Sequence, residues 1–95
     1  MSILDSATTR DSLRYLQLDL EEVRGRLEAE DESVLAILDR ETPEAWPPAD
    51  AELEAEIGAL RELHRHLHAA AAAIQYAAGK GSAVLHKAET GRWPA

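Results

Sequence analysis

The sequence of 95 residues contains no cysteine and no phenylalanine, and only 4% of its residues are aromatic. The absence of cysteine excludes disulfide bonds, thiolate chemistry and cysteine-ligated zinc sites, and it is consistent with a reducing compartment. Without phenylalanine, a core must be built from leucine, isoleucine, valine and alanine, which is typical of helix bundles. These absences favour a small all-helical protein.

Long apolar runs and a basic surface are missing as well. No segment approaches the roughly 18 apolar residues that a membrane-spanning helix needs, and residues 1–10 lack the basic and apolar stretches of a secretory signal. We therefore expect a cytoplasmic protein that does not bind membranes. The chain has 10 Lys and Arg against 18 Asp and Glu, a net charge of −8. Because nucleic-acid binding depends on clustered basic residues, we expect no nucleic-acid partner.

The first long helix is predicted over residues 9–41. Thr8 and Asp11 form a variant of the capping box at its start. Its apolar residues recur at alternating steps of three and four, as in a heptad repeat. Glu30 falls in this seam, so a kink near residues 30–33 is an alternative to a continuous helix. The apolar seam residues are Leu13, Leu16, Leu20, Val23, Leu27, Val34 and Ile37.

The second long helix is predicted over residues 50–78, after a proline-rich loop at 42–49. Asp50 is a good N-cap for this helix. In the loop, Trp46 is expected either to cover the open end of the helix pair or to anchor a partner. The seam of the second helix has the same period: Leu53, Ile57, Leu60, His64, Leu67, Ala71, Ile74 and Ala78.

Two glycines follow the second helix and leave its end open to two interpretations. Gly79 and Gly81 predict a break, with a short third helix over about 82–90 and a tail at 91–95. The alternative is one helix that continues through both glycines. The predicted fold is a single all-α domain at 1–95: an antiparallel hairpin of two long amphipathic helices and a short C-terminal helix. Dimerisation into a four-helix bundle is one way to complete it.

No motif in the chain predicts catalysis or a cofactor. His64 and His68 share a helix face, as two metal ligands would, but a third ligand and the HExxH order are missing because Arg65 follows His64. The plainer interpretation is a part-buried His64 on a polar helix, with no metal bound. The segment 79–82 lacks the full pattern of a phosphate-binding loop. We therefore expect a protein that is not an enzyme.

Incomplete burial carries the functional prediction. The apolar stripes are wider than a two-helix seam, so a further helix must cover them: a second copy in a homodimer, or an amphipathic helix of a partner protein. The expected partner-binding residues are Leu20, Val23, Leu27, Leu60, Leu63, Leu67, Ala71 and Ile74.

The layout of the chain resembles that of the small flagellar and type III export chaperones. The acidic and apolar segment from Leu27 to Arg40, a proline-broken loop and a long helix rich in alanine and leucine carry this resemblance, which covers about residues 15–90. It implies a helical hairpin or bundle that holds an aggregation-prone terminal segment of a secreted filament, cap or hook-junction protein before export. It also implies stoichiometric binding without turnover.

Two other functional classes fit the sequence. One is an acidic phage- or plasmid-borne inhibitor that binds a basic site of a nucleic-acid enzyme, and the other is a structural homodimer subunit. Inhibitor binding through carboxylates should weaken steeply with salt, whereas capture of an amphipathic helix should change little. The carboxylates of the inhibitor hypothesis are Asp19, Glu21, Glu22, Glu28, Asp31 and Glu32.

Overall fold

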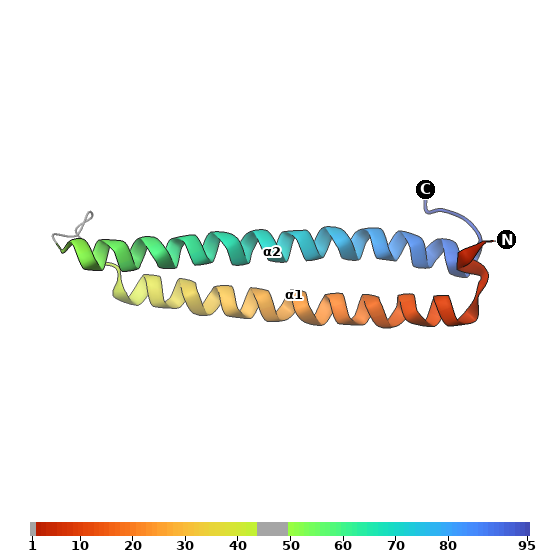
Figure 1. Cartoon of the computed structure of the whole chain (residues 1–95), viewed down its shortest axis with the longest axis horizontal. Helices are drawn as coiled ribbons and strands as arrows, with labels where there is room; N and C mark the ends of the chain where they lie inside the picture. The colour runs from red at the N-terminus through yellow and green to blue at the C-terminus, as the bar shows by residue number, and fades with distance from the viewer. Residues whose placement is uncertain (1, 44–49) are drawn as a thin grey trace. The chain divides into compact units, whose positions relative to one another are not determined.

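The computed structural model describes residues 2–43 and 50–95. These residues form a 3-10 turn, η1 (Ile3–Asp5), and two long helices, α1 (Ala7–Glu41) and α2 (Ala51–Thr90), with no strand among them (Figure 1). The prediction of an all-α chain with two long helices is confirmed. The predictions for Trp46 and most of the proline-rich loop lie outside the described residues.

The start of α1 differs from the prediction. Ser6 precedes the helix, and its Oγ accepts a hydrogen bond from the backbone N–H of Thr9 at 3.4 Å. The predicted capping box at Thr8 and Asp11 is therefore wrong, because Ser6 is an equally good N-cap two residues earlier. α1 then continues to Glu41 without a break near Glu30.

The start of α2 agrees with the prediction, and its end does not. Asp50 Oδ1 accepts hydrogen bonds from the backbone N–H groups of Glu52 at 2.9 Å and Leu53 at 3.4 Å, so the predicted N-cap is confirmed. The predicted break and separate helix over 82–90 are wrong, because α2 continues through both glycines to Thr90. Each glycine costs about 1 kcal/mol relative to alanine, and the strong helix formers around them outweigh this cost.

Two glycines in α2 provide a matched test of this helix. We expect Gly58→Ala to raise the free energy of unfolding by about 1 kcal/mol, because a methyl group there meets no atom within 4 Å. Gly81→Ala should bring no gain, because the new Cβ would overlap Oε1 of Gln17. Urea denaturation of both variants at one protein concentration measures the difference. Equal gains would mean that the Gln17 side chain moves aside without cost.

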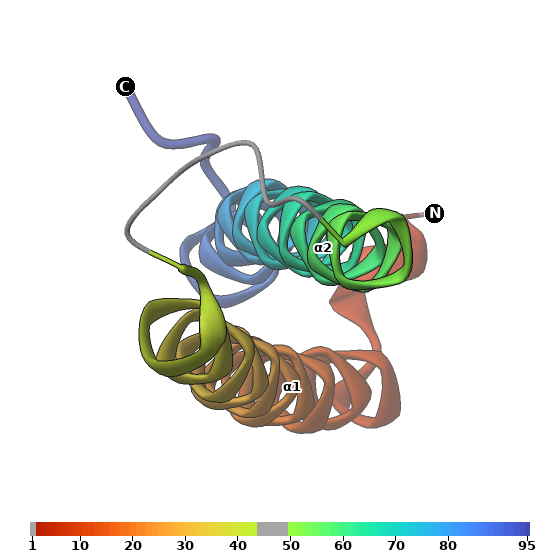
Figure 2. The same ribbon diagram turned by 90° about the vertical axis from the view of Figure 1, so that its left-hand side faces the viewer.

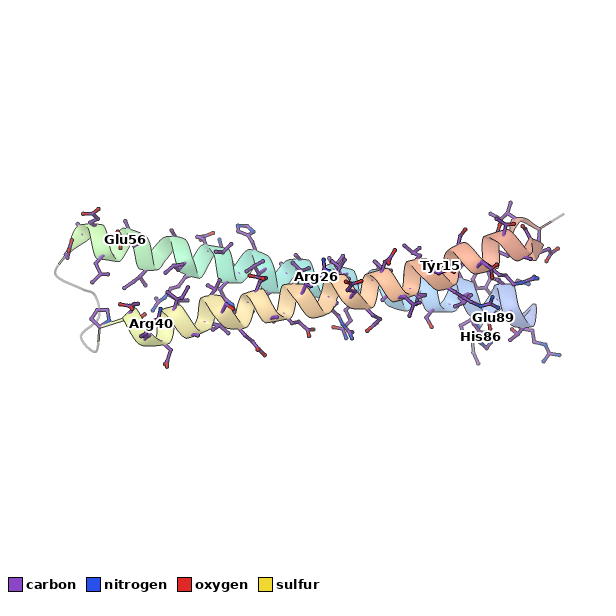
Figure 3. The ribbon with its side chains drawn as sticks, turned by 90° about the horizontal axis from the view of Figure 1, so that it is seen from below. Tyr15, Arg26, Arg40, Glu56, His86 and Glu89 are labelled. Atoms are coloured by element: carbon purple, nitrogen blue, oxygen red, sulfur yellow. The ribbon has the colours of Figure 1, made fainter. Side chains whose placement is uncertain are left out.

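The contacts of the chain divide it into two units. The terminal unit comprises Met1–Gly25 and Ala72–Ala95, and the loop unit comprises Arg26–Ala71. In each unit a segment of α1 contacts a segment of α2. In the terminal unit, Arg14 Nε donates a hydrogen bond to Glu89 Oε1 at 3.3 Å. Glu89 is labelled in Figure 3. Figure 2 is viewed from the end of the loop unit at which α1 ends and α2 begins.

Few apolar side chains are buried in either unit. Among the described residues, the buried apolar residues are Val34 and Ile57 in the loop unit and Ala78 in the terminal unit. Ile57 has the largest fully buried side chain, with 2% of its surface exposed. Most leucines of the seams remain half-buried. The two helices of each unit therefore leave much of their apolar surface in contact with water.

Candidate partner-binding surface

The predicted partner-binding residues are divided between the two units. Three of them belong to the terminal unit and five to the loop unit. Val23 and Leu63 are exposed, with 41% and 46% of their surface accessible. The other six are half-buried along the helix pairs: Leu20, Leu27, Leu60, Leu67, Ala71 and Ile74. Partial burial leaves each of them able to contact a further helix.

The seam of α1 differs from the prediction at three positions. Leu16, Val23 and Glu30 were expected to face α2, but all three are exposed. Leu16 and Val23 thus belong to the apolar surface that a partner can reach. The residues that follow them in sequence are less exposed: Gln17, Arg24 and Asp31.

Gln17 occupies a notch between small residues of α2 in the terminal unit. Its Nε2 donates a hydrogen bond to the backbone carbonyl of Ala78 at 3.0 Å. Gly81 leaves the space that the Gln17 carboxamide fills, since a Cβ at that position would overlap it. Gln17 Oε1 is buried and has no hydrogen-bond partner. A buried oxygen without a hydrogen-bond donor normally lowers stability. Gln17 is therefore held in the notch by its fit beside Gly81 and by the one hydrogen bond of its Nε2.

Asp31 and His64 form the corresponding polar contact of the loop unit. His64 Nδ1 lies 2.6 Å from Asp31 Oδ1, and Asp31 is the only buried charged residue among those described. An ionised carboxylate only accepts hydrogen bonds, so the Nδ1–H of His64 is the donor. α1 is continuous here because the exposed Glu30 keeps its carboxylate in water and the buried Asp31 carboxylate has its own donor. The contact also removes Asp31 from the carboxylates that an inhibitor would present.

The structure gives His64 a role other than the metal ligand weighed in the sequence. The His64 and His68 rings are 6.0 Å apart between centroids and tilted. In the part of the chain that is described, no group of three or more His, Cys, Asp or Glu residues is placed to hold a metal ion. His64 instead donates to Asp31 across the helix pair.

A shallow depression of about 700 Å³ on the loop unit was not predicted. Its lining combines two leucines with polar and charged side chains. Of the two leucines, Leu35 is exposed. The residues that line it are Leu35, Leu38, Asp39, Thr42, Arg61 and His64. In the sequence, Leu35 and Leu38 directly follow the seam residues Val34 and Ile37 and so widen the apolar stripe, which was the available signal. The depression is open to solvent and does not enclose a small molecule.

The two units differ in net charge. The loop unit contains 12 acidic and 4 basic residues, so it carries the whole net charge of −8. The terminal unit contains six of each sign and is neutral. A partner of the loop unit therefore meets a strongly acidic surface, and a partner of the terminal unit does not.

The total exposed surface is large for a chain of this mass. The protein exposes 7025 Å², whereas a compact monomer of 10.4 kDa is expected to expose about 5,400 Å². The excess of about 1,600 Å² on one chain is about twice the roughly 800 Å² that each partner contributes to an ordinary protein–protein interface. Within the described residues, neither helix has a stretch long and apolar enough to cross a membrane. The surface therefore has the size that a protein partner would cover.

Comparison of the chain with protein families, curated proteins and solved structures found no match. The likeness to export chaperones thus depends on the layout of the sequence alone, and the partner must be inferred from the chemistry of the exposed side chains.

Proposed function

We propose that this protein is a non-enzymatic binding module that holds an amphipathic helix of a partner protein, in the manner of the small export chaperones. The observation that supports this proposal most directly is the incomplete core: Val34, Ile57 and Ala78 are the buried apolar residues in the described chain. A helix laid on a half-exposed apolar stripe would complete the burial that two helices leave unfinished. Binding would be stoichiometric and without turnover.

The module is proposed to be one antiparallel hairpin. Two contacts support this arrangement: Gln17 with Ala78 in the terminal unit, and Asp31 with His64 in the loop unit. Residues 17 and 31 are two heptads apart on α1, and residues 64 and 78 are two heptads apart on α2. A single uninterrupted antiparallel pairing therefore accounts for both contacts.

The proposed binding surface is the stripe of Leu60, Leu63 and Leu67 on α2 of the loop unit. These residues are spaced by three and four, so they share one face of the helix. Leu63 is the most exposed of the three. Because the loop unit carries a net charge of −8, the partner helix should bear lysine and arginine on the polar face that surrounds its apolar stripe.

Binding of synthetic peptides tests this function. We expect the protein to bind a lysine- and leucine-based amphipathic helix, and not a glutamate-based peptide with the same leucines, in titrations followed by fluorescence anisotropy. Leu63→Ala should weaken binding about tenfold through lost apolar contact. The matched control is Leu35→Ala, which changes a side chain of similar exposure, 43% against 46%, on the other helix of the unit. Its affinity should equal that of the wild type.

Other outcomes of the titration would contradict the proposal in distinguishable ways. Failure to bind either peptide would reject the function. If Leu35→Ala weakens binding and Leu63→Ala does not, the partner helix binds in the depression lined by Leu35 and Leu38 and not on the α2 stripe.

The inhibitor class is the second candidate, and the charge of −8 on the loop unit favours it. It predicts binding that does not depend on Leu63 and that disappears at about 0.5 M salt, where exposed charges are screened.

A further inference from the structure

The terminal unit exposes most of the large apolar side chains of the described chain. Nine such side chains are exposed in all, and only Leu35 and Leu63 belong to the loop unit. The other seven belong to the terminal unit: Ile3, Tyr15, Leu16, Leu18, Val23, Tyr76 and Trp93. Apolar side chains mark an interaction surface where they adjoin one another, and among these seven Leu16 and Val23 are seven residues apart on one face of α1.

The charges of the terminal unit identify what can cover these side chains. Residues 1–25 contain five acidic and three basic residues, a net −2, and residues 72–95 contain one acidic and three basic residues, a net +2. The helical parts of these ranges, 7–25 of α1 and 72–90 of α2, carry −1 and +1. In a two-fold arrangement, residues 1–25 of one copy can lie against residues 72–95 of the other without net repulsion. The surface is therefore complementary in charge to a second copy of itself.

The loop unit does not have this property. Two copies that met through loop units would bring together two surfaces of net charge −8. Like charges at an interface oppose association. Self-association of the chain should therefore be confined to the terminal unit.

We propose that two copies of this protein associate through their terminal units, and that Leu16 and Val23 lie in the interface. Both residues are exposed, and their spacing of seven puts them on one face of α1. This proposal does not depend on the proposed function, because it concerns the unit that does not hold the partner helix.

Light scattering coupled to size-exclusion chromatography, at two protein concentrations, tests the association. We expect the wild-type protein to have twice the 10.4 kDa mass of one chain. The double variant Leu16→Glu/Val23→Glu should have the mass of a single chain, with its helix content retained in circular dichroism. A wild-type protein that is monomeric at both concentrations would overturn the proposal.

A double variant of the loop unit is the matched control. Leu35→Glu/Leu63→Glu changes side chains that are 43% and 46% exposed, against 47% and 41% for Leu16 and Val23. It should remain a dimer, and dissociation of this variant would overturn the assignment to the terminal unit. If the glutamate pair in the terminal unit lowers the helix content, Leu16→Ala/Val23→Ala replaces it, since alanine favours the helix. That variant should raise the dimer dissociation constant at least about tenfold, and an unchanged constant would reject the interface.

Discussion

Ile57→Ala is expected to lower the free energy of unfolding by about 3 kcal/mol, the usual cost of truncating a fully buried isoleucine. Ile57 is 2% exposed and has the largest fully buried side chain among the described residues. Few other buried residues are available to compensate for a cavity at this position. Urea denaturation followed by far-ultraviolet circular dichroism measures the change, at one protein concentration because association would shift the apparent stability.

The control for this prediction is an apolar residue of the same unit that water already reaches. Leu35→Ala removes a leucine that is 43% exposed, and its cost should stay at or below about 1 kcal/mol because less apolar surface is lost. Equal losses at the two positions would contradict the burial described for the loop unit.

His64→Ala should be the other strongly destabilising change, by about 2 kcal/mol. The substitution leaves the Asp31 carboxylate, 13% exposed, without its donor at 2.6 Å. Removing one member of a buried pair costs about 3–5 kcal/mol. The smaller figure applies here because the His64 side chain is 34% exposed and water can partly replace it.

A double substitution separates the cost of an unpaired carboxylate from the value of the pair. Asp31→Leu/His64→Leu should be at least as stable as the wild type, since apolar side chains can replace a buried polar pair without loss. The comparison uses the same urea denaturation. A double variant as unstable as His64→Ala would show that the pair stabilises the fold in its own right.

The sequence predicted the inward-facing residues of α2 better than those of α1, for a physical reason. The seam of α2 places alanine, leucine and isoleucine at nearly every inward position, so hydrophobicity alone identifies the buried face. Its start was equally readable, because the Asp50 carboxylate is a strong N-cap. The continuation of α2 past Gly79 could not be predicted in this way. A glycine costs a helix only about 1 kcal/mol, and the residues around it determine whether the helix continues.

In α1, hydrophobicity pointed to the wrong residues. Leu16 and Val23 are more apolar than Gln17 and Arg24, and both choices fit a step of three or four from Leu20. For two of the inward polar residues, α2 offers a partner: the carbonyl of Ala78 for Gln17 and the side chain of His64 for Asp31. A single helix cannot reveal such partners, since they lie on the other helix.

The candidate surface was only partly predictable for the same reason. Leu63 and Val23 were predicted from their spacing to bind a partner; the structure shows that they are exposed. The exposure of Leu16 and the neutral charge of the terminal unit depend on which segments of α1 and α2 contact one another. That information appears only when both helices are in place.

The contact of Asp31 with His64 also bears on how the chain avoids misfolding. Two helices with heptad seams can pair in several registers, because a slip of seven residues again matches apolar positions. In the loop unit such a slip would set the Asp31 carboxylate against Ile57 or Ala71 instead of His64. A buried charge without a donor is costly, so slipped pairings are penalised while the correct one is formed. The polar pair thus contributes to the uniqueness of the fold even if it adds little to its stability.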